Sequence, residues 1–268
     1  MKKNYLKITA GVMSSAMLIG LCAAGVPAKV IAATEHWNDA SASATQWNQW
    51  KNNWNTYSSN YEHVSLTPGA DQTQLNLAWY SHTTETPAVR IATKQNMDGA
   101  KEFVGTQTEA VTIDGVKYFS NKATVKGLKE NTKYYYQVFQ NGKWQDAETY
   151  TTKSFDSFSF LYVGDPQIGA SKNQTSTEQE KMVSAGNEVS SAAKDNLAAR
   201  NDGYNWNNIL NDAVKDHEDV SFIVSAGDQV NAGKNEREYA AYLGADALAS
   251  LPVATTIGNH DSVSNQYT

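Results

Sequence analysis

Cysteine is almost absent from this sequence. The 268 residues contain one, Cys22, and it lies in an apolar stretch near the N-terminus. The rest of the chain therefore has no disulfide framework, no thiolate metal site and no cysteine nucleophile, and its stability must come from core packing. Lipid attachment at Cys22 is disfavoured, because the bulky Leu21 precedes it where lipoprotein signals carry a small residue.

Clusters of basic residues are also missing. The chain has 22 Lys and Arg against 28 Asp and Glu, a formal net charge of -6, and no run of Lys or Arg forms a basic stripe. We therefore expect no nucleic-acid binding through phosphate neutralisation. A phosphorylated substrate is not excluded, because a bound metal can supply local positive charge. With 40% hydrophobic and 19% charged residues, the chain is globular and long enough for two domains.

Residues 1–33 have the layout of a secretory signal peptide. Three early lysines precede an apolar run over about residues 8–26, and small residues then lead to Ala33. We therefore expect a secreted or cell-surface protein with no stable membrane insertion after cleavage. The alternative is an uncleaved membrane anchor, since the run approaches spanning length, although glycine and serine dilute it.

Residues 34–61 are polar but rich in aromatic side chains. Five of these recur at helical spacing and form one stripe: Trp47, Trp50, Trp54, Tyr57 and Tyr61. A ligand platform, for instance for glycans, is one interpretation. Helical spacing favours the other, a short helix that docks its aromatic stripe on the next domain.

Residues 62–153 read as short strands separated by turns. Residues 74–80 alternate polar and apolar, and residues 88–92 form another strand pattern. Asp114-Gly115 and Asn141-Gly142 are hairpin signals. Short strands at regular spacing predict a β-sandwich.

The segment GLKENTKYYYQV, residues 127–138, makes this prediction more specific. It resembles the late strands of a fibronectin type III domain, in which a leucine precedes a turn and a Tyr-x-Tyr strand. The matching residues are Leu128, Tyr134 and Tyr136, and one of the two tyrosines is expected to close a corner. No catalytic side chains gather here, so we interpret the module as structural or positioning.

Residues 154–268 change to an α/β pattern. Strands are expected at residues 158–163, 219–226 and 252–257, with helices at 205–215 and 236–250 between them. Residues 171–200 are rich in Ser, Asn, Lys and Glu, and we expect a surface insertion containing a polar helix.

Each of the three strands ends in glycine followed by Asp or Asn. Ligands bind outside the carboxyl ends of strands in open α/β sheets, so Asp165, Asp228 and Asn259 are expected to converge. All three offer hard oxygen donors, and His260 follows directly. This mixture suits Mn, Fe, Zn or Mg better than a soft metal.

The order of these motifs resembles the calcineurin-like metallophosphoesterases, whose pattern is D-x-H, then G-D, then G-N-H-[DE]. GDPQ (164–167), GDQV (227–230) and GNHD (258–261) follow it. A fibronectin-like module in front is the layout of the purple acid phosphatases. The resemblance implies a multidomain chain: an all-β fibronectin III-like sandwich, then the first half of an α/β (αββα sandwich) metallophosphoesterase domain.

The resemblance also implies a role for each motif residue. Asp165 binds a first metal, Asp228 bridges two metals and Asn259 binds the second. His260 contacts the phosphate or leaving group, and Asp261 orients its imidazole. Two such cations clamp a phosphate and acidify a bridging water.

Two positions depart from the family pattern. Gln167 stands where the first motif has histidine, and Asn231 stands where purple acid phosphatases have a metal-binding tyrosine. Gln167 remains a possible ligand. The metals are expected to be Fe, Mn or Zn, with the choice among them open.

The family completes both metal sites with further histidines after G-N-H-[DE]. The other four histidines of this sequence precede that motif and lie in segments of different character: His36, His63, His82 and His217. We therefore expect the sequence to be the N-terminal portion of a longer protein. Alone it would bind metal weakly and be nearly inactive.

The predicted function is that of an exported metal-dependent phosphoesterase acting on phosphate esters. Monoesters are preferred, and a phosphodiesterase or nucleotidase is the nearest alternative, because the same two-metal chemistry serves both. The rival from another class is a non-catalytic extracellular binding protein, in which the fibronectin-like module and the Trp-rich helix act. Gln167 and Asn231 are its best support.

Overall fold

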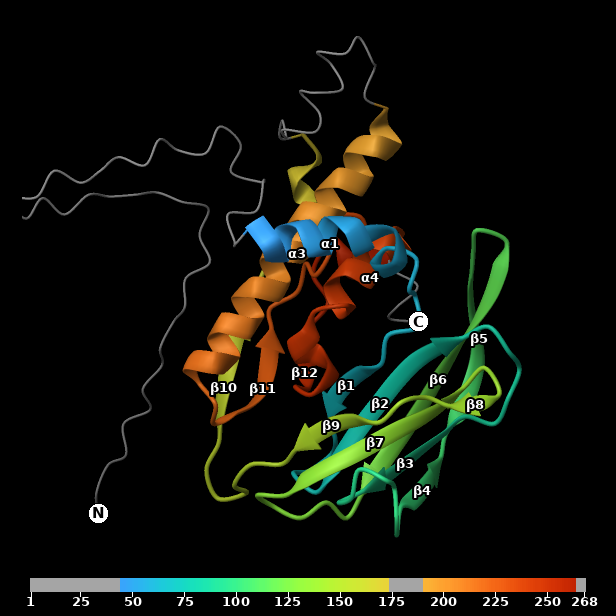
Figure 1. Ribbon diagram of the computed structural model, residues 1–268, viewed down its shortest axis with the longest axis vertical. Helices are drawn as coiled ribbons and strands as arrows, with labels where there is room; N and C mark the ends of the chain where they lie inside the picture. The colour runs from blue at the N-terminus through green and yellow to red at the C-terminus, as the bar shows by residue number, and fades with distance from the viewer. Residues whose placement is uncertain (1–43, 174–189, 264–268) are drawn as a thin grey trace, which may run out of the picture.

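A computed structural model describes residues 44–173 and 190–263 (Figure 1). The predicted signal peptide, residues 1–33, lies outside the described residues. Among the helices that the model does describe, none is long and apolar enough to cross a membrane.

The first domain is a β-sandwich of two antiparallel sheets, preceded by helix α1 (Ala44–Tyr57). One sheet has the strand order β1 (Ser65–Pro68), β2 (Gln74–Ser81), β6 (Val116–Lys126) and β5 (Thr106–Ile113). The other has the order β4 (Lys101–Val104), β3 (Ala88–Ala92), β7 (Lys133–Gln140) and β8 (Lys143–Trp144), and β9 (Glu148–Thr151) also pairs with β7.

Alternation along the strands builds the sandwich core. In β7 every second side chain is buried, and in β2 the buried series is Leu75, Leu77 and Trp79. These residues pack with β-branched side chains of the facing sheet in one cluster. Asp114 and Asn141 take positive φ angles of 50° and 53° beside glycine, so both predicted hairpin turns are present.

The two tyrosines of the Tyr-x-Tyr strand have different partners. The Tyr134 hydroxyl oxygen accepts a hydrogen bond from the Lys129 backbone N–H at 2.8 Å, a short-range contact that closes the corner of the sandwich. The Tyr136 hydroxyl instead donates to the Ala249 carbonyl oxygen of the second domain at 2.7 Å. Tyr134 is therefore the corner residue.

The second domain is a parallel three-stranded sheet of β10 (Ser159–Val163), β11 (Val220–Ser225) and β12 (Val253–Thr255), in that order. The connections are η1 (Ala170–Asn173) and α3 (Ser191–Asp216), then α4 (Glu236–Leu243) and η2 (Asp246–Ala249); η3 (Asp261–Val263) follows β12. Both crossovers step in the same direction, so right-handed connections place their helices on one face of the sheet.

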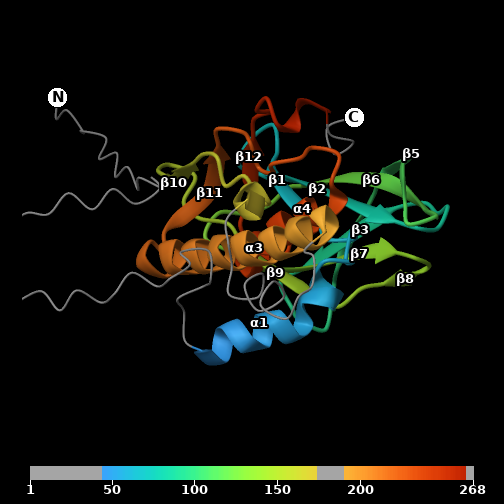
Figure 2. The same cartoon turned by 90° about the horizontal axis from the view of Figure 1, so that it is seen from above.

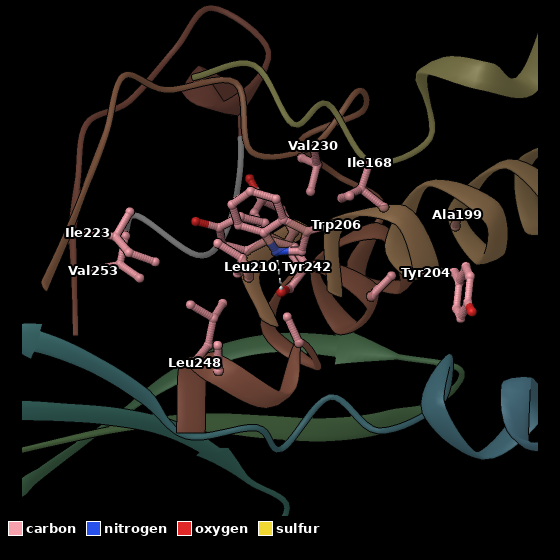
Figure 3. Packing of buried hydrophobic residues seen from close by; sticks show 14 of the residues in the cluster. Ile168, Ala199, Tyr204, Trp206, Leu210, Ile223, Val230, Tyr242, Leu248 and Val253 are labelled. Atoms are coloured by element: carbon pink, nitrogen blue, oxygen red, sulfur yellow. Dashed lines mark hydrogen bonds between the residues drawn. The ribbon is translucent and has the colours of Figure 1, made fainter. Parts of the chain in front are cut away.

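The core of this domain lies between the sheet and those helices (Figure 3). Trp206 of α3 stacks on Tyr242 of α4 with ring centroids 5.3 Å apart, and its indole N–H donates to the Tyr242 carbonyl oxygen. On the opposite face of the sheet Phe160 and Phe222 stack at 5.6 Å, and Phe160 is 42% exposed. Within residues 44–173 and 190–263, helices thus cover one face of the sheet and leave the other exposed.

The expected surface insertion at 171–200 is wrong for its last ten residues. Helix α3 begins at Ser191, after the Ser190 side chain caps the Ala193 N–H, and continues without a break to Asp216. Residues 197–201 are buried in it. These are one leucine, two alanines and the polar Arg200 and Asn201, so the segment carries little apolar signal although α1 contacts it at Arg200.

Helix α1 packs across α3, as Figure 2 shows from above. The Trp50 indole N–H donates to the Arg200 carbonyl oxygen and the Trp54 indole N–H to Asn196 Oδ1, both at 2.8 Å. Trp47 lies 5.1 Å from the Tyr204 ring. Trp47, Trp50 and Trp54 therefore serve packing on α3 of the second domain. Tyr61 lies beyond the end of α1 and packs edge-on against Tyr118 of the sandwich, with ring centroids 6.0 Å apart.

Candidate metal centre

The three strands of the parallel sheet end level with one another. Val163 of β10 pairs with Ser225 of β11, and Ser225 pairs with Thr255 of β12. The loops that follow therefore leave the same edge of the sheet, which is the edge where α/β sheets bind ligands.

The first two loops run side by side. The backbone N–H groups of Asp165 and Gln167 donate to the carbonyl oxygens of Gly227 and Asp228, at 3.2 and 2.9 Å. Further along, Ile168 forms a parallel bridge with Val230. The structure thus brings the predicted ligands of the first and second motifs together through their backbones.

Three of these residues have an unusual backbone. Asp165, Gln167 and Asp228 have positive φ angles of 50°, 37° and 51°, in the region that side chains other than glycine disfavour. Such conformations cluster at functional sites, where the surrounding structure holds them. Positive φ angles therefore occur at three of the four predicted metal ligands, as they also do at the turn residues Asp114 and Asn141.

The third loop reaches the second through glycine. A Cβ atom built on Gly258 would overlap the Asp228 carboxylate, and one built on Gly227 would lie 2.7 Å from the Gly258 nitrogen. Only glycine permits this approach, which seats GNHD against Asp228. The Asp228 side chain is 8% exposed, and its Oδ1 accepts the His260 backbone N–H at 2.9 Å. Within the described residues its other oxygen accepts no hydrogen bond.

The His260 imidazole is oriented by a carbonyl group. Its Nδ1 lies 2.6 Å from the Asn231 carbonyl oxygen, which can only accept, so Nδ1 carries the proton. The other ring nitrogen, Nε2, is then left for a substrate or a metal.

This contact corrects the role expected for Asp261. Its carboxylate, which is fully buried, accepts hydrogen bonds from the backbone N–H groups of Gln229 and Gly258 and from the Tyr239 hydroxyl. No hydrogen bond from Asp261 to the imidazole is found in the described part of the chain. Asp261 therefore ties the second and third loops together, because backbone donors of those loops already occupy its oxygens.

Buried polar residues that the sequence did not single out also hold the loops. Gln229 is 0% exposed, and its amide donates to Ser225 Oγ at 2.8 Å and to the Thr256 carbonyl oxygen at 3.1 Å. No local sequence pattern identifies this glutamine, because one of its two partners, Thr256, lies 27 residues away at the end of another strand. It fixes the ends of β11 and β12 relative to each other.

Glu238 stabilises the far side of the same loops. Its carboxylate accepts the Ala232 N–H at 2.7 Å and the Asn235 side-chain amide at 2.9 Å, and a Cβ on Gly169 would overlap it. Burial raises its pKa to about 7. Asn235 caps α4 and Glu238 follows three residues later, so a capping-box pattern is the sequence signal that could have identified it.

Asp202 of α3 holds the exit of the first loop. Its Oδ2 accepts the backbone N–H groups of Gly169 and Ser171, at 2.9 and 3.2 Å, and burial raises its pKa. Buried carboxylates from α3 and α4 thus stabilise the loop that carries Asp165 and Gln167.

The donor chemistry fits one side of a metal centre. Asp165 and Asn259 are exposed at the sheet edge. One carboxylate oxygen of Asp228, which lies on the loop of the second motif, accepts no hydrogen bond within the described residues. The described residues contain no group of three or more His, Cys, Asp or Glu that could hold one ion. His217 does not contribute, because it caps the end of α3 at the opposite edge of the sheet. His36 lies outside the described residues.

Comparison with known families matches both domains. The model of the purple acid phosphatase N-terminal domain matches residues 61–152, and that of the calcineurin-like phosphoesterases matches residues 158–268. No protein with a curated description matches the chain.

Two solved structures are similar in part. Purple acid phosphatase PPD1 from yellow lupin (Lupinus luteus) seeds is 15% identical with a TM-score of 0.48, over 74% of this chain and 35% of that one. PhoD is 11% identical with a TM-score of 0.41, over 75% of this chain and 40% of that one. The chain thus spans well under half the length of either structure.

Proposed function

The chain is a purple acid phosphatase-like metallophosphoesterase, and on this premise we propose that its three strand-end loops form one side of a site that hydrolyses phosphate esters. One observation supports the proposal above all: the three motifs leave level strand ends, and backbone hydrogen bonds and the close approach of Gly227 and Gly258 hold their loops together.

Metal ligands in this proposal are Asp165, Asp228 and Asn259, with Gln167 as a further oxygen donor. Cations bound there would act as Lewis acids toward the phosphate and lower the pKa of a bound water. Asp228 suits the shared position, because its loop contacts both of the other two and one of its carboxylate oxygens has no hydrogen-bond partner among the described residues. The metals proposed are Fe, Mn or Zn.

His260 is the proposed catalytic acid. Its Nδ1–H is fixed on the Asn231 carbonyl oxygen, so a proton taken up by Nε2 gives an imidazolium whose charge this oxygen stabilises. Nε2–H can then protonate the departing alkoxide. Asp261 acts as a positioning residue, because it holds the loops of Asp228 and Asn259 in place.

The proposed substrates are phosphate monoesters outside the cell. Export is proposed from residues 1–33, whose layout is that of a signal peptide. Diesters and nucleotides remain the alternative, because the described residues supply only one side of the pocket.

The test uses the protein encoded by the complete reading frame, loaded in turn with Mn, Zn and Fe. Hydrolysis of 4-nitrophenyl phosphate and bis(4-nitrophenyl) phosphate is measured for wild type, for Asp228→Asn and for the surface control Asp219→Asn. Activity that Asp228→Asn abolishes and Asp219→Asn retains supports the proposal. Absence of hydrolysis of both substrates with every metal would defeat it.

The alternative of an extracellular binding protein loses one of its supports. The aromatic stripe that was to form a ligand platform is buried against α3, with Trp50 and Trp54 at 8% and 3% exposure. The binding-protein alternative is then supported only by Gln167 and Asn231, the two positions that differ from the family pattern.

A further inference from the structure

A cavity of about 430 Å³ lies between the two domains, away from the strand-end loops. Strands β1, β2 and β6 of the sandwich form one wall, and α4, η2 and β12 form the other. Figure 1 shows these elements facing one another, and Leu248 in Figure 3 lies on the side of the sandwich strands. Domain interfaces are a preferred place for small-molecule sites, and this volume is within their usual range.

Buried polar atoms at the cavity have no partner in the described residues. The Tyr80 hydroxyl and His63 Nε2 are shielded from solvent and make no hydrogen bond within the described chain. Tyr80 is only 6% exposed. Buried polar groups are nearly always satisfied, so two unsatisfied ones at a single cavity indicate a missing partner.

The charge of the cavity restricts what that partner can be. None of the lining residues is Asp or Glu, and the one lining cation, Lys122, is exposed at the rim. Burial lowers the pKa of His63 to about 4, so its imidazole is neutral at physiological pH. Burial and the charge of the nearby Glu236 raise the pKa of Tyr80. An anionic ligand would therefore be repelled and would find no counter-charge in the lining other than Lys122 at the rim.

The remaining wall is largely aromatic and aliphatic. Rings from both domains contribute to it, together with leucine side chains of the second domain: Tyr61, Tyr239, Tyr242, Leu243 and Leu248. Such a wall favours a flat apolar body over a sugar with hydroxyls on every side.

We propose that this cavity binds a small neutral aromatic molecule with a hydroxyl group, whose ring packs against the interface rings and whose hydroxyl bonds to Tyr80 and its neighbours. The proposal is independent of the phosphoesterase activity, because it uses none of the predicted metal ligands. Asp228→Asn should therefore bind such a molecule as the wild type does.

The experiment measures binding of three probes by ligand-observed NMR: phenol, toluene and benzoate. We expect phenol to bind best, toluene more weakly and benzoate not at all. Tyr80→Phe removes only the hydroxyl and should weaken phenol binding about 5-fold, the value of one ordinary hydrogen bond, while leaving toluene unchanged. The matched control is Tyr134→Phe, which removes a tyrosine hydroxyl elsewhere in the sandwich.

A second variant fills the cavity. Ala78 lines it from β2, and Ala78→Leu should abolish binding of both phenol and toluene while the far-UV spectrum and cooperative unfolding remain. Phenol binding that is equal in Tyr80→Phe and wild type would overturn the proposal. Crystals soaked in phenol that show ordered waters alone in the cavity would also overturn it, since waters would then be the missing partners.

Discussion

Nδ1 of His260 and the carbonyl oxygen of Asn231 lie 2.6 Å apart, and this contact leaves Nε2 as the working nitrogen of the imidazole. In the protein from the complete reading frame, His260→Ala should keep its metals and lose about 10²–10⁴-fold in kcat, the span of a positioned general acid. Metal content and kcat are measured together. Asn231→Ala is the matched control, because it retains the carbonyl group and should change kcat little. Loss of metal from His260→Ala would reassign the imidazole as a ligand.

Asp228→Asn should lower metal occupancy at the whole centre and turnover with it. The amide oxygen can still accept the His260 N–H, but a neutral amide is a weaker donor to a cation and its nitrogen cannot coordinate. Metal analysis after gel filtration measures occupancy. Full occupancy in Asp228→Asn would mean that GDQV has been placed wrongly in the site.

Asp261→Asn should destabilise the fold by about 1–3 kcal/mol. The substitution replaces one carboxylate oxygen by an NH2 group, which cannot accept the backbone N–H that this oxygen accepts in the wild type. Urea unfolding of the metal-free protein measures this. The control is Asp246→Asn, whose exposed carboxylate accepts longer side-chain hydrogen bonds at 3.3 and 3.4 Å and should cost under about 1 kcal/mol. Equal effects of the two variants would remove the loop-tying role of Asp261.

Gly169→Ala should lower the free energy of unfolding by more than the strain of its backbone angle alone would. Gly169 has φ +103°, and an added Cβ would overlap the Glu238 carboxylate, so we expect a loss of about 2 kcal/mol or more. Gly99→Ala serves as the control, since Gly99 has φ +73° but open space around it and should lose only about 1 kcal/mol. Urea unfolding of both variants separates the overlap from the strain, and equal losses would contradict the contact.

His63 and Glu238 should give the stability of the metal-free protein opposite pH dependences. The pKa of His63 falls from 6.5 to about 4 on folding, so only the unfolded chain binds the proton between these values and stability drops as pH falls from 6.5 to 4. The pKa of Glu238 rises from 4.5 to about 7, so the unfolded chain loses its proton first and stability drops as pH rises from 4.5 to 7. Each effect is at most about 3 kcal/mol.

Replacement by glutamine separates the two contributions. His63→Gln should flatten the loss on the acid side, and Glu238→Gln should flatten the loss toward pH 7, in urea unfolding with a chelator present. If both variants keep the wild-type pH profile, neither group titrates as its burial implies.

Local patterns in the sequence predicted most of the sheets. Alternation marked β2, the resemblance to a Tyr-x-Tyr strand marked β7, and the glycines after β10, β11 and β12 marked the edge at which their loops meet. These signals are local, because they follow from side-chain period and from turn conformation.

The features that were missed depend on distant partners. Residues 197–201 of α3 are buried and contact α1, but only one of them is a large apolar side chain, so little apolar period shows there. The roles of Asp261 and Asn231 were missed for a similar reason. Asp261 adjoins His260 in sequence but accepts from the loop at Gln229, 32 residues earlier, and a backbone carbonyl such as that of Asn231 has no sequence signature.

The Trp50–Arg200 contact has a consequence for synthesis on the ribosome. The two residues are 150 positions apart. At ordinary elongation rates of about 5–20 residues per second, Arg200 is therefore synthesised about 8–30 s after Trp50. An isolated helix of 14 residues is barely stable in water. We expect arrested nascent chains to remain cleavable by protease at residues 44–57 until α3 has emerged, although the intervening sandwich is already complete. The first helix of the described residues is then among the last parts of the chain to fold, and its tryptophans remain accessible to chaperones throughout that interval.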